Sequence, residues 1–448
     1  MLNKQQNVQS IVERKLCVGC GTCFALCPRS AIKLVIDKAQ EVYIPEVDTE
    51  KCNSCQICIK VCPGSDVDFN YLNNAIFGKY PDDKLIGNYL ECHVGRSTDS
   101  SILQNATNGG LVTALLAFAL EEKLINGALV TGWNPDNPLQ PLTFIARTKE
   151  ELLLAGKSKY CPVPVNTALK EILESKESEK FAVVGLPCHI HGLRKAEQIN
   201  QKLKNKMVLH LGLFCGSNST FKGVEFLLKK VGIKKDEVAH FDFRSGGWPS
   251  NLSIIKKNNE VTKIPYKRVV SILEAFTPQY CRLCCDGTNE LSDISFGDAW
   301  LSELTAKNIA TSMIICRNSA GKSLVDAAQT KNVVKLSSAT SEDVLRSQIS
   351  LIYSRKRLAN ATQHLHGKTG LFTGVSLQKP EIIDYIFAIY LQTYNMYKFK
   401  LFAHLLVHMP YMMIRLQSMP IALRARYWRY NQKRSLRGFI KAHTKQLK

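Results

Sequence analysis

Two cysteine runs carry the clearest chemical signal in the sequence. The first reads CVGCGTCFALCP from Cys17 to Pro28, and the second reads CNSCQICIKVCP from Cys52 to Pro63. In the pattern C-x2-C-x2-C-x3-C-P, three closely spaced thiolates hold one four-iron cluster and the fourth cysteine crosses to the other cluster. The spacing therefore predicts two 4Fe-4S clusters. The predicted ligand sets are Cys17, Cys20, Cys23 and Cys62 for one cluster, and Cys52, Cys55, Cys58 and Cys27 for the other.

A pair of zinc sites is the alternative interpretation, because C-x2-C spacing also binds zinc. Zinc ribbons, however, build one four-ligand site from two separated C-x2-C pairs, without a third cysteine or a C-P ending. We also expect Gly19 and Gly21 to leave room for backbone N–H groups beside the sulfurs. Iron–sulfur clusters move single electrons and transform no substrate by themselves, so the larger part of the chain must define the reaction.

A second candidate is a glycine-rich helix start at Asn108, Gly109 and Gly110, within NATNGGLVTALLAFALEEKLINGALV. Free N–H groups and the helix dipole at such a start favour an anion such as a phosphate. An ordinary helix cap is the alternative interpretation of the same residues.

The composition describes a globular chain that must position these groups. With 448 residues and 45% hydrophobic content, it should hold two to four domains. The N-terminus lacks the basic start and apolar stretch of a secretory signal, which predicts a cytoplasmic protein. In a reducing compartment, clustered cysteines indicate metal binding rather than disulfides. Eight of the sixteen cysteines lie in the two runs.

Changes in composition along the chain predict four segments. The predicted domains are residues 1–75, the cysteine-rich module; 88–170 and 171–345, two parts of a central domain; and 375–448, a basic aromatic helical tail. A polar, turn-rich connection at KYPDDKLIGNY, Lys79 to Tyr89, marks the first boundary. In the central domain, helical patterns alternate with short apolar runs, which is typical of an α/β fold. The runs are ALVTGW, FAVVGLP, MVLHLGLF, ISFGD and SMIIC.

The central domain resembles a known family at AGKSKYCPVPVN, VGLPCHIHGLRK, LGLFCG and YCRLCCDGTNELSDISFGDAW. These motifs, in this order, are similar to the beta subunits of coenzyme F-420-reducing hydrogenases and F-420-linked dehydrogenases. The same family includes 7-hydroxymethyl chlorophyll reductases and ferredoxin-dependent vinyl reductases. The resemblance covers residues 88–340, and family members with an added N-terminal two-cluster ferredoxin module are known.

The resemblance implies an α/β (α+β) flavin-binding core domain with FAD and a third 4Fe-4S cluster. The matching cluster positions are Cys188, Cys215, Cys281 and Cys284. Core thiols are the alternative for isolated cysteines, and Cys285 adjoins a ligand position and could replace Cys284. The remaining thiols, which we expect to be ordinary, are Cys92, Cys161, Cys285 and Cys316.

The resemblance also places the flavin. The implied cofactor-binding residues are Thr107, Asn108, Gly109, Gly110, Thr113, Ser158, Lys159 and Tyr160. A lysine near the flavin N1 and C2 oxygen would stabilise the reduced anion, which makes Lys159 the candidate catalytic residue; a solvated surface lysine is the alternative. For His189 and His191 we expect structural roles. The remaining matches to family positions, with no step assigned, are Arg244, Trp248, Asp286, Asp293 and Asp298.

Together these features predict an iron–sulfur flavoprotein oxidoreductase that joins one-electron and two-electron chemistry. Its partner would be an electron-carrier protein or a redox-complex subunit, and its hydride donor or acceptor would be coenzyme F-420 or an organic substrate. A non-catalytic electron-transfer subunit, linked to polysaccharide synthesis at the membrane, is the alternative. The direction of electron flow and a homo-oligomeric state are left open.

The tail accounts for about half of the net charge of +21, with 12 Lys and Arg against two acids after residue 379. Its basic run from Arg424 to Arg437 alternates with aromatic residues, which suits the surface of an anionic membrane. RNA binding and packing on its own domain are the alternatives, and we do not expect nucleic acid as a partner. No window holds 18 apolar residues free of charge, so a spanning helix is not predicted.

Overall fold

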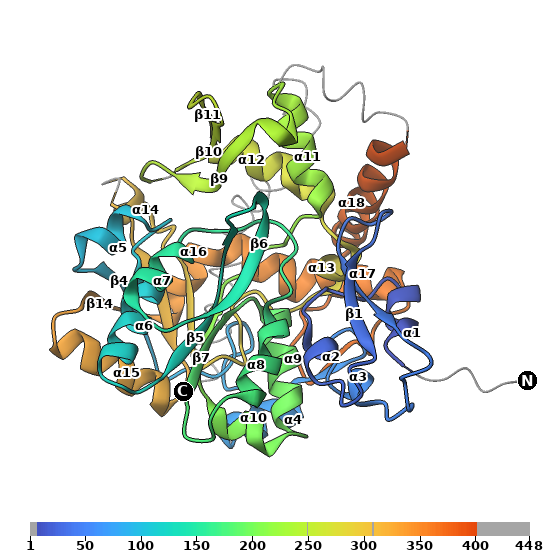
Figure 1. The fold of residues 1–448 in the computed structure, drawn as a ribbon, viewed down its shortest axis with the longest axis horizontal. Helices are drawn as coiled ribbons and strands as arrows, with labels where there is room; N and C mark the ends of the chain where they lie inside the picture. Colours follow the sequence, from blue (N-terminus) through green and yellow to red (C-terminus); the bar gives the residue numbers. More distant parts are fainter. Residues whose placement is uncertain (1–6, 249, 307–308, 401–448) are drawn as a thin grey trace, which may run out of the picture. The chain divides into compact units, whose positions relative to one another are not determined.

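The computed structural model describes residues 7–248, 250–306 and 309–400, with side chains described as far as residue 392. The chain through Gln392 forms one compact unit, and Thr393 onward belongs to a second. Figure 1 shows the first unit with its elements labelled.

The cysteine-rich segment is built from short helices and one β-ribbon. Its elements are α1 (Gln9–Glu13), α2 (Thr22–Ala25), β1 (Ile32–Ile36), β2 (Tyr43–Val47), α3 (Ile57–Lys60), β3 (Val67–Asp68) and α4 (Phe69–Phe77). Strands β1 and β2 pair antiparallel, and β3 pairs in parallel with β15 (Phe372–Thr373) from the far end of the unit. The two ends of this unit are therefore joined by a sheet.

The central domain is organised around an eight-stranded sheet of order β14-β4-β13-β12-β8-β7-β5-β6. Its strands are β4 (Glu91–Ser97), β5 (Gly127–Asn134), β6 (Asn137–Ala146), β7 (Phe181–Gly185), β8 (Met207–Leu213), β12 (Ile294–Asp298), β13 (Ser312–Cys316) and β14 (Val334–Ala339). Neighbours among β5, β7, β8 and β12 pair in parallel, and the flanking strands are antiparallel. All five apolar runs predicted as strands form strands, which confirms the α/β class.

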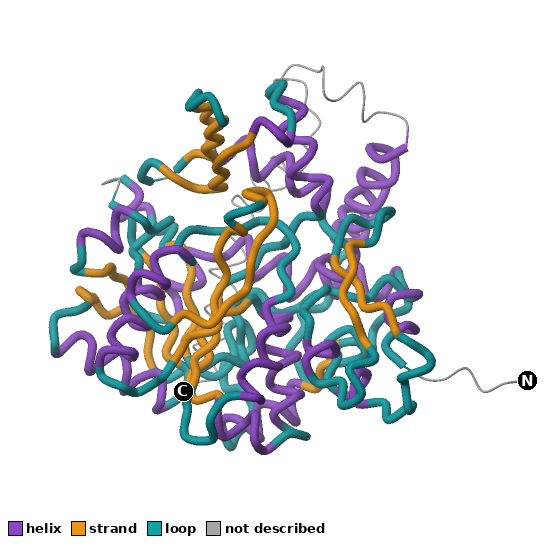
Figure 2. Tube along the Cα trace, viewed as in Figure 1, coloured by secondary structure: helices purple, strands orange, loops and turns teal. Residues whose placement is uncertain are grey.

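Helices cover both faces of this sheet, as Figure 2 shows by the purple segments around the orange strands. On one face Ala128, Val130 and Ala182 pack with α6 (Leu111–Glu121) and α15 (Ser319–Thr330). On the other face Phe181 and Val183 pack with the helices between β6 and β8. Those helices are η1 (Val165–Ala168), α8 (Leu169–Glu174), α9 (Pro187–Glu197) and α10 (Gln201–Lys206). Helix α7 (Lys149–Leu154), which directly follows β6, packs instead on the first face with α6 through Leu152. The alternation of burial partners along β7 follows from the two-residue repeat of a strand.

The cysteine-rich segment shares the hydrophobic core of the second face. Leu16, Val61, Phe69 and Leu72 are buried in the same cluster as Leu193 of α9. The segment therefore packs on the α9 side of the sheet, where Figure 1 shows α2 beside α9.

The remaining elements cross the carboxyl ends of the strands or lie at their edges. They are α5 (Ser100–Gln104), α11 (Phe221–Lys230), η2 (Lys235–Glu237), β9 (Val238–Ser245), β10 (Asn251–Lys256), β11 (Val261–Pro265), α12 (Tyr266–Leu273), η3 (Glu274–Phe276), α13 (Gln279–Leu283), α14 (Ser302–Thr305), α16 (Ser341–Tyr353), η4 (Ser354–Leu358), α17 (Ala359–Leu365) and α18 (Ile382–Lys400). Strands β9, β10 and β11 form a separate antiparallel sheet.

The predicted tail is described only at its beginning. Helix α18 runs to Lys400, and the basic run from Arg424 to Arg437 lies outside the described residues. In the part that is described, no helix is long and apolar enough to cross a membrane.

Candidate redox site

The first predicted cluster set comes together around α2. Cys23 lies in α2, and burial raises the pKa of its thiol, with further increases from the neighbouring thiols of Cys20, Cys62 and Cys17. Burial raises the pKa of Cys62 to about 12, and the Cys20 thiol adds to this shift. Cys62, from the second motif, therefore lies with the first three cysteines, as the crossover pattern predicts.

The second predicted set lines a small hollow of its own. Cys27, Cys52, Cys55 and Cys58 all border it, so the last cysteine of the first motif lies with the first three of the second. Cys55 is exposed, whereas Cys20, which holds the same motif position in the first run, is buried. The second set therefore lies nearer to solvent.

Both cysteine loops need left-handed backbone at the same two motif positions. In the first loop these are Gly19 (φ 67°) and Gly21 (φ 87°), and in the second they are Ser54 (φ 56°) and Gln56 (φ 61°). Gly19 also donates its N–H to Cys17 Sγ at 3.4 Å, the kind of sulfur contact that the glycine suggested. Because side chains other than glycine pay for this conformation, the second loop carries strain that the first avoids.

The third predicted set gathers from three separate segments. Cys188 lies in the first turn of α9, Cys215 follows β8, and Cys281 and Cys284 lie in and directly after α13. Burial raises the pKa of Cys188, and the thiols of Cys281, Cys215, Cys20 and Cys284 raise it further. Thiols from three separate segments of the chain are therefore neighbours.

Cys284 rather than Cys285 belongs to this group. Burial raises the pKa of Cys284 to about 11, and its neighbours include the guanidinium of Arg355 and the Cys281 thiol. Cys285 is fully buried, and its foremost charged neighbour is Lys356. The three other thiols expected to be ordinary, Cys92, Cys161 and Cys316, are buried as well.

The first and third sets are neighbours, since Cys20 is among the thiols that raise the pKa of Cys188. Asn166 bridges the two segments by donating to Thr22 Oγ1 and to the His189 carbonyl, both at 2.8 Å. A Cβ on Gly192 of α9 would lie 2.5 Å from Thr22 Oγ1, so only a glycine allows this approach.

A cavity of about 400 Å³ opens at the carboxyl ends of β7, β8 and β12. This volume lies within the range of small-molecule sites, and such crevices are the usual ligand position in open α/β sheets. Four of the predicted cofactor-binding residues line it: Thr113, Ser158, Lys159 and Tyr160. Cys215 lines it too, so the third cysteine set adjoins the cavity.

The other four predicted cofactor residues lie behind the cavity wall. Thr107 Oγ1 accepts from the Ser158 N–H at 3.1 Å, and Asn108 Nδ2 donates to Asp298 Oδ1 at 2.9 Å. A Cβ on Gly109 would meet the Gly95 carbonyl oxygen at 2.5 Å. Gly110 is the N-cap of α6 and has φ 69°, a left-handed conformation that glycine adopts without strain. Val112 and Thr113, in the first turn of α6, are the residues of this segment that reach the cavity.

Lys159 is enclosed rather than solvated. Its ammonium donates to the carbonyls of Ala155 at 2.8 Å, Gly156 at 2.5 Å and Lys157 at 3.2 Å. Burial lowers the pKa of Lys159 to about 8, because a charge in a low-dielectric site loses its hydration. The ammonium of Lys159 is therefore held by backbone carbonyls at the edge of the cavity.

Arg244 supplies a second positive charge at the cavity. It is 2% exposed, and it donates to Asp298 Oδ2 at 2.6 Å and to Ser250 Oγ at 2.9 Å. Its guanidinium lies 4.5 Å from the Tyr266 ring centroid, while Nη2 is buried without a hydrogen-bond partner. An unpaired N–H of a charged group at a cavity wall favours an anionic ligand.

The histidines beside Cys188 are bonded within the protein. His189 Nδ1 accepts from the Leu186 N–H at 3.1 Å, so Nε2 carries the proton and donates to the Val163 carbonyl at 3.0 Å. Burial lowers the pKa of His189 to about 4, which keeps it neutral. His191 pairs with Asp286 at 2.9 Å. Asp293 pairs with Arg194 and His210 in the interior.

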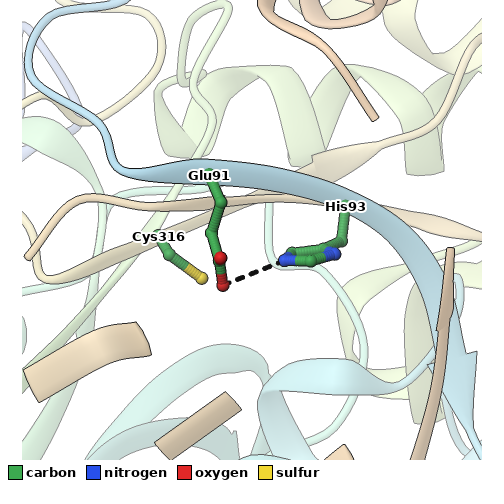
Figure 3. A group of neighbouring side chains, drawn as sticks. All are labelled: Glu91, His93 and Cys316. Atoms are coloured by element: carbon green, nitrogen blue, oxygen red, sulfur yellow. Dashed lines mark ion pairs between the residues drawn. The ribbon is translucent and has the colours of Figure 1, made fainter. Parts of the chain in front are cut away.

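A mixed group of Glu91, His93 and Cys316 lies away from the cavity on β4 and β13 (Figure 3). Their ligand atoms lie within 4.8 Å of one another, and His93 Nε2 is 3.0 Å from Glu91 Oε1. The Lys322 ammonium lies 2.7 Å from Glu91 Oε2. This cation already balances the carboxylate and would repel a divalent ion, so we interpret the group as an ion-pair network.

Sequence reasoning missed the charged residues of the η4 turn. Arg355 donates to carbonyls beside the third cysteine set, and Lys356 pairs with Glu290 in the interior. The run of basic residues at 355–357 was the available signal, because adjacent charges on different sides of a helix cannot all face solvent, and a buried charge must find a partner.

Models of known protein families match three stretches of the chain. The family described as coenzyme F420 hydrogenase/dehydrogenase, beta subunit, matches with its N-terminal part at residues 92–170 and its C-terminal part at residues 178–342. A 4Fe-4S dicluster domain matches residues 10–67.

The curated relatives include proteins with named activities. The coenzyme F420 hydrogenase subunit beta of Methanosarcina barkeri is 32% identical over 49% of this chain and 75% of its own length. The coenzyme F420-dependent sulfite reductase of Methanocaldococcus jannaschii is 27% identical over 73% of this chain and 48% of its own length. Among solved structures, a chain of the F420-reducing [NiFe] hydrogenase complex from Methanosarcina barkeri matches with a TM-score of 0.50 and 27% identity, over 61% of this chain and 90% of that chain.

Proposed function

The chain belongs to the coenzyme F420 hydrogenase/dehydrogenase beta subunit family and carries a 4Fe-4S dicluster domain, and we propose that it couples a hydride-transferring flavin to three 4Fe-4S clusters. It is an iron–sulfur oxidoreductase related to the F420 hydrogenase beta subunit and to F420-dependent sulfite reductase. The observation that carries the proposal is that Cys215, from the third cysteine set, lines the 400 Å³ cavity.

The cavity residues fit FAD. Apolar walls and buried cations suit an aromatic ring system with a diphosphate, and the unpartnered Nη2 of Arg244 is a donor in need of an anion. When bound, FAD would accept a hydride and release its two electrons singly. Arg244 and the start of α6 would hold the anionic portion. Lys159 would place its positive charge near the reduced flavin ring, and the side chain of Tyr160 would form part of the wall around that ring.

The proposed electron route is linear. The third set adjoins the cavity through Cys215. It adjoins the first set through Cys188, whose neighbours include Cys20. Cys58, of the second set, is among the thiols that raise the pKa of Cys23. The second set, with exposed Cys55, would exchange electrons with a carrier protein or a partner subunit. Coenzyme F420 is the proposed hydride donor or acceptor, on the names of the relatives.

Anaerobic purification tests the proposal by its metal content. We expect about 12 irons per chain for three four-iron clusters, together with one FAD. Cys188→Ala should lower the count to about eight, whereas Cys161→Ala, another buried cysteine outside the three sets, should leave it unchanged. A preparation with zinc and no flavin would contradict the proposal.

A turnover assay separates an enzyme from an electron-transfer subunit. The isolated chain should reduce or oxidise coenzyme F420 with an artificial one-electron carrier if the cavity is a reaction site. Full cofactor content without turnover of F420 or other hydride carriers would favour the non-catalytic alternative.

A further inference from the structure

Arg355 lies in a π-helical turn, η4, between α16 and α17. Arg355 is 4% exposed, and its guanidinium donates hydrogen bonds to backbone carbonyls. Nε donates to the Cys215 carbonyl at 3.2 Å, Nη1 donates to the carbonyls of Cys281 and Cys284, and Nη2 donates to the Gly216 carbonyl. One guanidinium therefore ties the loop after β8 to the end of α13.

Three of these four carbonyls belong to cysteines of the third set, and the fourth belongs to Gly216. A planar guanidinium with five donors suits such a convergence, whereas a lysine could not reach both loops in one plane. The positive charge of Arg355 therefore lies in the interior, directly beside the cysteines of the third set.

The local helix geometry explains why this arginine reaches the carbonyls of the third cysteine set. In the run SRKRL, successive side chains leave the helix in different directions. Lys356 pairs with buried Glu290, and Arg357 pairs with Asp384 at 2.7 Å. Each of those two cations has a carboxylate partner, while the hydrogen bonds of Arg355 go to carbonyls. Single π turns inside helices recur at functional sites, where they redirect a side chain.

We propose that Arg355 fixes the ligand loops of the third cluster and raises its reduction potential. The inference rests on the third cluster of the proposed function. Reduction adds one negative charge to a cluster, and a fixed cation in a low-dielectric interior stabilises that charge. Arg355 would thereby make the cluster beside the cavity a better acceptor for electrons from the hydride-transfer site.

The test uses the full chain, purified anaerobically, with three variants. Arg355→Gln removes the charge, Arg355→Lys keeps the charge but loses the planar fork, and Arg357→Gln is the matched control from the same turn. Iron content is measured first, and a redox titration followed by electron paramagnetic resonance then gives the midpoint potentials. The third cluster is identified as the signal that Cys281→Ala removes.

We expect Arg355→Gln to lower the midpoint potential of the third cluster. At a fixed solution potential the ratio of reduced to oxidised cluster should fall at least tenfold, which corresponds to a shift of about 59 mV for a one-electron couple. Arg355→Lys should fall between Arg355→Gln and wild type, and Arg357→Gln should match wild type. Loss of about four irons in Arg355→Gln alone, restored in Arg355→Lys, would also support the inference.

Two results would overturn it. One is a third cluster with unchanged potential in Arg355→Gln, and the other is an equal change in Arg357→Gln. A wild-type chain with about eight irons would instead remove the third cluster, and with it both the proposed function and the inference. The wild-type count therefore tells the two failures apart.

Discussion

Asn166 donates one hydrogen bond to Thr22 and a second to the carbonyl of His189, each at 2.8 Å. Thr22 lies between Cys20 and Cys23 in the first cysteine loop, and His189 directly follows Cys188. One buried amide thus holds the first and third cysteine sets in register. The electron route that we propose depends on this contact.

Asn166→Ala should loosen that junction. Asn166 is fully buried, and its loss leaves the Thr22 hydroxyl and the His189 carbonyl with one partner fewer. We expect the free energy of unfolding to fall by about 1–3 kcal/mol, measured by anaerobic denaturant titration. The exposed Asn205→Ala control should stay within about 0.5 kcal/mol of wild type. Equal effects of the two substitutions would show that the bridge carries no special stability.

Gln56→Gly should stabilise the second cysteine loop. Gln56 holds φ 61° at the motif position where the first loop has Gly21, and glycine adopts this conformation without a Cβ clash. We expect slower loss of the second cluster to an iron chelator, with a gain of about 1 kcal/mol. Gln40→Gly, a change of the same type in the turn between β1 and β2, should leave chelation rates unaltered. Faster cluster loss in Gln56→Gly would contradict the strain argument.

Arg244→Gln should weaken flavin binding. The substitution removes the unpartnered Nη2 and the positive charge beside the cavity. Hydrogen bonds to charged groups contribute about 1.5–3 kcal/mol, so we expect at least about tenfold weaker FAD binding by fluorescence quenching. Arg346→Gln, which removes an exposed arginine from a surface ion pair, should bind FAD as wild type does. Undiminished affinity in Arg244→Gln would exclude Arg244 as the anion contact.

Lys159 should give flavin binding a pH dependence. Burial lowers its pKa to about 8, so its ammonium is charged below that pH and neutral above it. We expect FAD affinity to fall about tenfold between pH 8 and pH 9.5, since charge on Lys159 is lost there. Lys159→Met should bind weakly and evenly across this range, and the exposed Lys170→Met should keep the wild-type profile.

The loss of FAD affinity above pH 8 cannot be explained by an effect of Lys159 on the stability of the fold. An unfolded lysine titrates near pH 10.4, so the unfolded state binds more protons than the folded state between pH 8 and that value. The contribution of Lys159 to the free energy of unfolding therefore rises with pH in this window. An affinity that fell equally in Lys159→Met would assign the dependence to another group.

Features that depend on local spacing could be predicted from the sequence. Cysteines at three-residue steps share one loop, and short apolar runs form buried strands, so the two cysteine runs and the strands β5, β7, β8, β12 and β13 were predictable. The pairing of Cys62 with the first loop followed from the same motif. The third cysteine set needed a family resemblance, because Cys188, Cys215 and Cys281 have no common spacing.

The partners of the isolated polar residues follow from the tertiary structure. The ammonium of Lys159 is held by backbone carbonyls, Asn166 bridges two cysteine segments, and Arg355 contacts the carbonyls of three cysteines. Their neighbours come from strands and helices that are distant along the chain. The burial of a charge or an amide is a property of the packed interior, and local spacing does not specify it.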